Sequence, residues 1–289
     1  MADIRIIKIG DKDYPKLLKK IPQAPKILYC RGELKKEEPC FSVVGTRLCS
    51  PYGKQVVQDI AGSLANSGLT IVSGLATGID ALAHKSATDR NKRTIAVLGT
   101  GVDQASIYPK ENIQLSKKIL ETGGCIISEY PPGTRPSRYN FPERNRIISG
   151  LSLGTLVVEA KEKSGSLITA NLAILHKRKL FAVPGPIYSL NSAGTNLLIK
   201  KGAKLVDKYT DIMEELGLSA KYLKKENLAE SQNPEEKKIL EALLEEPLYI
   251  DKIIEKTKLN AKTTASLLTE MELEGKVKNL GANIFAISR

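Results

Sequence analysis

Between residues 41 and 216 the sequence alternates short apolar runs with longer stretches of helical periodicity. The runs at 41–45, 69–73 and 93–98 are apolar nearly throughout, whereas a strand exposed on one face would alternate apolar with polar residues. The stretch 52–66 carries its apolar residues three and four apart, as a helix does. Strand, helix and strand repeated in this way predict a parallel sheet with helices on both faces, and therefore an α/β fold.

The pattern changes after residue 234. Predicted helices at 235–245, 250–256 and 261–274 are followed by two short strands that the turn at 281–283 joins. Three helices and a hairpin predict a small C-terminal winged-helix domain. We therefore expect four parts, which are a short N-terminal segment (1–38), an α/β domain (39–216), a linker (217–233) and a winged-helix domain (234–289).

The positive charge of the chain is confined to its first three-quarters. Lys and Arg number 44 and Asp and Glu number 32, which gives a net charge of +12. Residues 217–289 hold 12 of each sign, so the whole excess lies in 1–216. Such a surface favours a polyanion, either nucleic acid or anionic lipid, and the alternative is charge that serves solubility alone.

Several classes of protein are excluded. No apolar run approaches the roughly 18–20 residues that span a bilayer, so we expect no membrane partner. The N-terminus lacks the apolar stretch of a secretory signal, and we expect a cytoplasmic protein. The four cysteines are scattered without CxxC spacing, which predicts neither disulfides nor a metal site.

Two strand-to-helix junctions have the composition of anion-binding turns. The first strand runs into Gly45, Thr46 and Arg47, where a glycine lets an anion approach and the arginine supplies a planar cation. Ser164, Gly165 and Ser166 open a later helix with backbone and hydroxyl donors. The first junction is not GxGxxG, so no dinucleotide cofactor is expected, and a tight turn with a surface arginine is the alternative.

The segment 129–150 interleaves arginines with aromatic residues. Cations contact phosphates and aromatic rings stack on bases, so this mixture is typical of single-stranded nucleic-acid binding. We interpret the segment as a loop that its prolines stiffen. The alternative is a solvated charged loop whose aromatic residues lie in the core.

Asp80 and His84 stand four residues apart on a predicted helix and can therefore pair. A catalytic pair is one interpretation, although no nucleophile motif accompanies it. The other is that both residues cap and steady the loop after the second strand.

Taken in order, these motifs resemble the DNA-processing protein A (DprA) family. The resemblance covers about residues 10–216, and 234–289 resembles the winged-helix domain often appended to that family. The ordered set is specific, whereas each piece alone is weak. The matching segments are VVGTR, SGLATGIDALAH, GTGVDxxxxYPxxN at 99–112, SEYPPG, FPxRNRIISGLS, VVEAxxxSGSLITA and VPGP.

The resemblance implies an extended Rossmann-like core without catalytic activity or cofactor. It implies that this core binds single-stranded DNA, protects incoming DNA, forms a homodimer and helps to load the RecA recombinase during natural transformation. Self-association is implied near the helix 194–203, at Leu197, Leu198 and Ile199. The DNA contacts that the motifs imply are Gly45, Thr46, Arg47, Arg138, Phe141, Arg144, Asn145, Arg146, Ser164, Gly165 and Ser166, with a structural role as the alternative for Arg146.

Two other functions remain open. Phosphoribohydrolases with related folds cleave nucleoside monophosphates with a GGxGT loop and a catalytic glutamate, but the corresponding segment 183–186 is Val-Pro-Gly-Pro. A transcriptional regulator would read DNA with the winged helix. Its expected recognition helix at 261–274 has Lys262 as its only cation against three glutamates, which duplex phosphates would repel.

Overall fold

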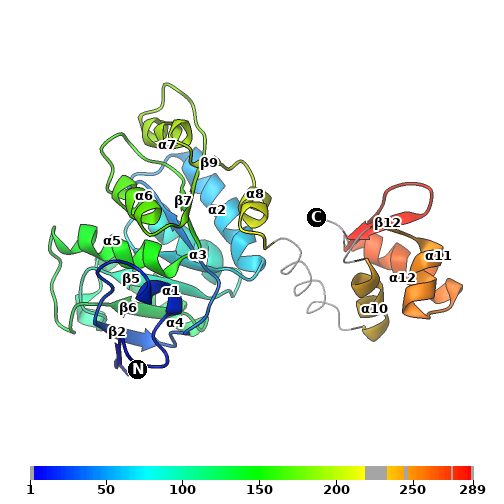
Figure 1. Cartoon of the computed structure of the whole chain (residues 1–289), viewed down its shortest axis with the longest axis horizontal. Coiled ribbons are helices and arrows are strands. Elements are labelled where there is room, and N and C mark those ends of the chain that lie inside the picture. Colours follow the sequence, from blue (N-terminus) through cyan, green and yellow to red (C-terminus); the bar gives the residue numbers. More distant parts are fainter. Residues whose placement is uncertain (1–2, 219–232, 244–246, 275, 288–289) are drawn as a thin grey trace. The chain divides into compact units, whose positions relative to one another are not determined.

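The computed structural model describes residues 3–218, 233–243, 247–274 and 276–287, and the chain divides into two compact units, Met1–Leu216 and Gly217–Arg289 (Figure 1). Apart from its two ends, the predicted linker at 217–233 lies outside the described residues. None of the described helices is long and apolar enough to cross a bilayer.

A nine-stranded sheet forms the centre of the first unit, in the order β1-β2-β6-β5-β4-β3-β7-β8-β9. Strands β3 to β9 run parallel, whereas β1 and β2 form an antiparallel edge. Every residue of the five central strands is buried, so their apolar sequences follow from cover on both faces. The α/β prediction is confirmed. The strands are β1 (Arg5–Lys8), β2 (Ile27–Gly32), β3 (Cys40–Val44), β4 (Thr70–Ser73), β5 (Thr94–Leu98), β6 (Cys125–Ser128), β7 (Gly154–Val157), β8 (Lys179–Ala182) and β9 (Lys204–Leu205).

Helices cover both faces of this sheet (Figure 1). Successive strand residues point to opposite sides, so the apolar residues of each strand need cover on both faces. On β5, Val97 belongs to the core cluster that contains Ile148 of α5, whereas Ala96 belongs to the cluster that contains Ile119 of α4. The helices are α1 (Lys16–Lys19), α2 (Pro51–Asn66), α3 (Ile79–Thr88), α4 (Ile113–Glu121), α5 (Asn140–Leu151), α6 (Gly165–Leu175), α7 (Leu190–Lys200) and α8 (Tyr209–Glu215), with short 3-10 turns at Gln104–Ser106 and Lys110–Asn112.

The interpretation of 129–150 as a loop is wrong for its second half, which forms α5. Pro142 stands in the first turn of α5, where its missing N–H has no helical partner to lose. The buried residues of α5 gather toward its C-terminal end, so the polar first turns gave no helical periodicity. The arginines of this segment are therefore held on a helix.

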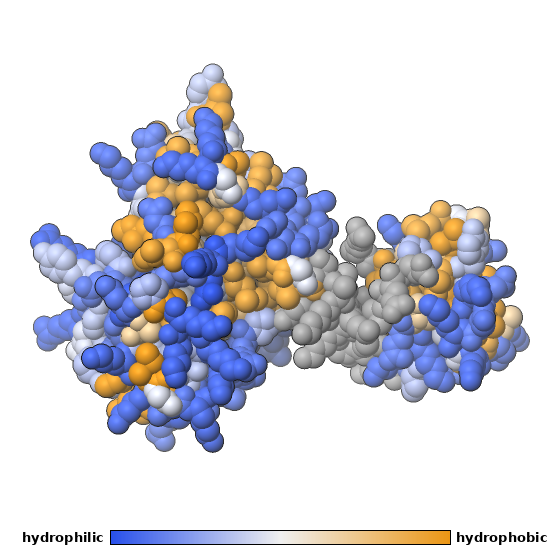
Figure 2. Space-filling model, in the orientation of Figure 1, coloured by the Kyte–Doolittle hydropathy of each residue, from blue (hydrophilic) through white to orange (hydrophobic). Residues whose placement is uncertain are grey.

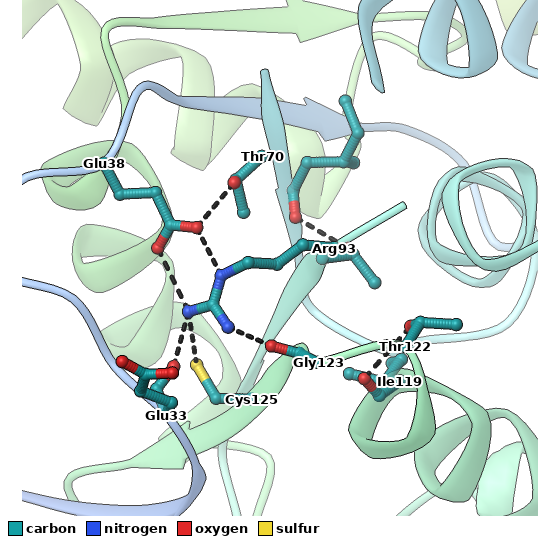
Figure 3. A network of polar contacts seen from close by, with 10 residues as sticks. Glu33, Glu38, Thr70, Arg93, Ile119, Thr122, Gly123 and Cys125 are labelled. Carbon is teal, nitrogen blue, oxygen red and sulfur yellow. Dashed lines mark hydrogen bonds and ion pairs between the residues drawn. The ribbon is translucent and has the colours of Figure 1, made fainter. Parts of the chain in front are cut away.

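The N-terminal segment 1–38 contributes β1 and β2 to the same sheet, next to β6. Arg93, just before β5, joins this segment to the starts of the parallel strands (Figure 3). Its guanidinium contacts the Glu38 carboxylate, at 3.1 Å for Nη2–Oε2, and donates to the carbonyl oxygen of Gly123. Thr70 Oγ1 donates to Glu38 at 2.6 Å. The loop before β3 is thus fixed by a largely buried ion pair.

The second unit is a winged-helix domain with its own apolar core, which confirms the predicted fold. The hairpin of β11 and β12 gains a third strand, β10, that the sequence did not predict. The elements are α10 (Pro234–Ala242), β10 (Leu248–Tyr249), α11 (Ile250–Thr257), α12 (Ala261–Leu273), β11 (Val277–Asn279) and β12 (Ile284–Ile287).

Candidate functional site

The strand order of the first unit reverses between β3 and β7. From β3 the chain adds β4, β5 and β6 on one side, then returns to β7 and continues to β8 and β9 on the other. In open parallel sheets, ligands bind in the crevice outside the carboxyl ends of the strands at such a point. An open cavity of about 660 Å³ lies there, lined by the loops after β3, β4 and β7 and by the start of α5.

The loop after β3 is held rigidly by backbone contacts. Thr46 N donates to the Glu159 carbonyl at 2.8 Å, and the Thr46 carbonyl accepts from Ile79 N at 3.1 Å. A side chain at Gly45 would lie 2.6 Å from Ile79, so glycine is required there. This fixed loop presents the exposed Arg47 at the cavity, with its guanidinium carbon 5.8 Å from the Phe141 ring centre.

The start of α6 supplies the other wall of the cavity. Ser164 caps the helix, and its hydroxyl lies 2.8 Å from that of Ser166. Gly165 has open space where a side chain would stand, so a ligand can approach the first amide groups of α6. These N–H groups and the positive end of the helix dipole favour an anion. Lys161 and Lys163 line the same cavity and are exposed.

The start of α5 brings cationic, aromatic and amide side chains to the cavity. Arg138 stacks on the exposed Tyr139 ring, 4.8 Å from its centre, and Asn145 lines the cavity beside them. The Phe141 ring lies 5.9 Å from that of Tyr108, which comes from the segment after β5. The two rings form an aromatic wall next to the cations.

Arg144 lies beneath the cavity and is only 4% exposed. Its Nη1 donates to the carbonyl oxygen of Gly74 at 2.8 Å and to that of Val97, so it joins the ends of β4 and β5. Burial lowers the pKa of Arg144 to about 10, which leaves it charged at neutral pH. Arg144 therefore adds positive potential from below and organises two strand ends.

Arg146 does not line the cavity, although it belongs to the same helix. Its guanidinium forms two hydrogen bonds with the Glu129 carboxylate, at 2.7 and 2.6 Å, and its Nε donates to the Gln23 carbonyl. The structure therefore brings ten of the eleven residues proposed for DNA binding to the cavity and places Arg146 in an ion pair.

Asp80 and His84 have separate partners. Asp80 Oδ2 accepts from Gly74 N at 3.1 Å and so steadies the loop after β4, as the second interpretation of the sequence held. His84 Nδ1 lies 2.7 Å from Thr94 Oγ1. Burial lowers the pKa of His84 to about 3, so its imidazole is neutral inside the fold.

Some cavity residues were missed from the sequence, notably Tyr108, Lys161 and Lys163. All three stand inside motifs that carried the family resemblance, but no local signal separates a lining side chain from a solvated one. Within the described ranges, no ion pair involves Arg47, Arg138, Lys161 or Lys163. Asp80 alone supplies an acidic group to the cavity lining that the structure describes.

The three residues proposed for self-association differ in exposure. Leu197 is 40% exposed on α7, whereas Leu198 is 6% exposed and belongs to the core, and Ile199 packs partly against it. Leu197 also lines a groove of about 630 Å³ between α6 and α7.

These features define a class, a doubly wound α/β protein whose switch-point crevice is lined by cations and by a helix N-terminus, followed in sequence by a winged helix. The family model described as DNA recombination-mediator protein A matches residues 5–217, and the DprA winged helix domain matches 224–283. The chain belongs to the DNA recombination-mediator protein A (DprA) family.

Relatives and solved structures agree with this assignment. The chain is 44% identical over 215 residues to DNA processing protein DprA of Bacillus subtilis (strain 168), covering 74% of this chain and 71% of that protein. It is 38% identical over 278 residues to Protein Smf of Escherichia coli (strain K12), covering 93% and 74%. DNA processing protein A of Streptococcus pneumoniae superimposes with a TM-score of 0.69 at 42% identity, covering 74% of each chain. DNA processing protein A of Helicobacter pylori, whose structure concerns a single-stranded DNA binding mode, superimposes with a TM-score of 0.65 at 32% identity, covering 74% and 99%.

Proposed function

We propose that the first unit binds single-stranded DNA in the cavity at the β3/β7 switch point. The carrying observation is the group of cations that have no ion pair in the described residues, beside the open start of α6 and next to the aromatic pair of Tyr108 and Phe141. Phosphates need cations and N–H donors, and unpaired bases need a ring on which to stack. The binding mode reported for the Helicobacter pylori relative supports this proposal.

The residues proposed for DNA binding have different roles. Arg47, Arg138, the amides of Gly45 and Gly165, and the hydroxyls of Thr46, Ser164 and Ser166 hold phosphates. Phe141 stacks on a base, and Asn145 donates from its amide. Arg144 and Arg146 act from behind the surface, where they hold α5 and the strand ends in place.

We further propose the cellular role that the family suggests, in the cytoplasm. The protein protects incoming single strands and helps to load the RecA recombinase on them during natural transformation. The description of the family as a recombination mediator supports this role.

Self-association belongs to the same proposal. Hydrophobic surface gathers over α6 and α7 in Figure 2, and Ile174 and Leu175 are 58% and 62% exposed there, with Leu197 beside them. We propose that this surface forms a homodimer. Leu197→Glu should give a monomer in light scattering, whereas a charge at the buried Leu198 would disrupt the core instead.

The two alternatives have less support. A phosphoribohydrolase needs a free carboxylate at its substrate, and Asp80, the acid of the described lining, is already bonded to Gly74 N. A regulator needs a cationic recognition helix, and α12 carries one lysine against its glutamates. A binding protein fits both observations.

The proposal is tested by titrating labelled single- and double-stranded oligonucleotides at several salt concentrations. We expect tighter binding of single strands and an affinity that falls as salt rises, because counterions are released from the phosphates. Equal binding of both forms, or none, would contradict it. Base release from nucleoside monophosphates would favour the enzyme instead.

A further inference from the structure

A group of exposed apolar side chains stands beside the cavity without a partner in the described fold. Tyr188 is 94% exposed and Ile187 80%, both in the segment between β8 and α7, and Leu190, the first residue of α7, is 74% exposed. Leu48 and Tyr52, after β3, are 77% and 44% exposed. We call these five residues the apolar shelf. Water-exposed apolar groups so close together are typical of an interaction surface.

The segment that carries the shelf is rigid at its base. The Asn196 side chain accepts from Gly185 N at 3.2 Å and donates to the Gly185 carbonyl at 3.0 Å. Tyr52 donates from its hydroxyl to the Pro184 carbonyl at 2.8 Å. Tyr188 itself has no hydrogen bond within the described residues. The position of this segment is therefore fixed at its base, while the Tyr188 ring forms no hydrogen bond that stabilises the described fold.

The shelf is continuous with the cavity. Leu48 lines the cavity, and its carbonyl accepts from the Asn191 side chain at 3.1 Å, next to Leu190. β8 lies two strands from β3 in the sheet, which is about 10 Å at a spacing of about 4.8 Å per strand. A strand of nucleic acid advances about 3.4 Å per nucleotide even when fully stacked, so a few nucleotides cover that distance.

The charges around the shelf suit a polyanion. No acidic residue occurs between Val183 and Ile199, and Arg47 is the only charge between Val44 and Gly53. The loop that Asn191 contacts through the Ala160 amide carries the exposed Lys161, Glu162 and Lys163, which leave it with a net positive charge. An exposed tyrosine offers a ring to a base without reading its identity.

We propose that the apolar shelf is a second binding surface for single-stranded DNA, on which Tyr188 stacks with a base of the strand leaving the cavity. This inference rests on the proposed function of the cavity. It extends the contact from the phosphates at the switch point to the bases beyond β8. The shelf therefore increases the number of nucleotides in contact with the protein. It adds affinity only when the strand is long enough to reach it.

The chain has no tryptophan, so Tyr188→Trp places a single fluorescent reporter on the shelf. A long oligothymidylate should quench its emission, and the same strand with abasic sites should not. Ile6→Trp, at a position 57% exposed on β1 at the other end of the sheet, is the control and should stay unquenched. Anisotropy of the labelled strand reports in parallel whether DNA is bound at all.

Affinity gives the second measurement. Tyr188→Ala should weaken binding of a long strand about 5- to 140-fold, which converts the typical cost of about 1–3 kcal/mol for one lost stack, and should leave a strand too short to pass the cavity unaffected. Tyr188→Phe should bind as the unmodified protein does.

The outcomes separate the two proposals. If the unmodified protein does not bind single-stranded DNA at all, the cavity proposal is contradicted. Normal DNA binding with no quenching in the Tyr188→Trp protein and no effect of Tyr188→Ala overturns the shelf alone. A Tyr188→Ala protein that loses self-association in light scattering but binds long strands normally would make the shelf a protein contact, which also overturns it.

Discussion

Arg93 and Arg47 lie at opposite ends of the parallel strands, Arg93 where they begin and Arg47 where they end. Arg93 has an acidic partner, whereas Arg47 has none in the described residues. At the edge where β5 begins, the Arg93 guanidinium is bound by the Glu38 carboxylate and by backbone carbonyls (Figure 3). At the edge where β3 ends, Arg47 is exposed and has no ion pair within the described part of the chain, and its guanidinium lies near the Phe141 ring. Arg93 therefore stabilises the fold, whereas the guanidinium of Arg47 is accessible to a ligand.

The contrast shows that function follows from the partners of a charge rather than from the number of charges. Both arginines contribute equally to the net charge of +12. Only the edge without acidic partners can bind a polyanion, because a paired arginine has already exchanged its donors for protein acceptors. The predictions that follow test this division, beginning with the largest expected effect.

Arg93→Ala should destabilise the first unit by about 3–5 kcal/mol, because it leaves the largely buried Glu38 carboxylate without its partner. Chemical denaturation measures the change. The protein that remains folded should bind single-stranded DNA with unchanged affinity.

The matched control removes both charges. A double variant with Arg93→Leu and Glu38→Leu should recover much of the lost stability, since a buried pair often exchanges for apolar residues at little cost. If Arg93→Ala reduced DNA affinity without reducing stability, the division between the two edges would be wrong.

Lowering the pH tests a buried group between the two edges. Burial lowers the pKa of His84 to about 3, against about 6.5 when unfolded, so below pH 6.5 the unfolded state binds the proton more readily. Stability should fall with pH, by about 2 kcal/mol for this group between pH 6.5 and 5. Denaturation midpoints across that range measure the slope.

His176 contributes in the same direction, because burial lowers the pKa of its imidazole too. His84→Asn, which removes the titrating group, should therefore reduce the slope without abolishing it. An unchanged slope would show that the imidazole of His84 is accessible to protons in the folded state.

Arg47→Ala should weaken single-stranded DNA binding by about 1–3 kcal/mol, the usual size of a charge-assisted hydrogen bond. The salt dependence should lose about 0.7 from its slope, as expected for one phosphate contact fewer. Thermal stability should not change, because the exposed side chain lacks an ion pair in the described residues. Arg5→Ala, exposed on β1, is the matched loss of charge and should bind normally. Unaltered affinity in a stable Arg47→Ala protein would remove Arg47 from the interface.

Phe141→Ala tests the apolar part of the same edge. We expect a loss of about 1–3 kcal/mol in affinity with little change in the salt slope, because stacking releases no counterions. Phe141→Tyr keeps the ring and should retain most of the affinity. A loss of fold stability with normal binding by the folded fraction would assign Phe141 to the core instead.

The sequence located the site, at the carboxyl ends of the parallel strands, more readily than it predicted the role of each residue. Apolar strands and glycine turns located the junctions after β3 and β7, since both depend on local patterns. The run Arg144-Asn145-Arg146 did not reveal its roles. On a helix each successive residue turns by about 100°, so these neighbours face the strand ends, the cavity and Glu129 in turn. Without the helix, which Pro142 and its polar first turns concealed, all three residues were expected at the DNA, with a structural role as the alternative for Arg146 alone.

The smallest effect is expected from the winged-helix unit, where basic and acidic residues are balanced. Residues 217–289 carry 12 basic and 12 acidic residues. On the wing, Lys276 Nζ lies 2.8 Å from the Glu236 carboxylate and 2.5 Å from that of Glu274, which leaves Lys278 as the cation without an ion pair in the described part of β11. Few phosphate contacts are available, and each would add only about 0.7 to the salt slope. Deleting residues 230–289 should therefore change the affinity for single-stranded DNA by less than about tenfold, or about 1.4 kcal/mol. A larger loss with a lower slope would show that this unit binds DNA despite its paired lysine, and a loss of RecA loading at unchanged affinity would assign it to a protein partner.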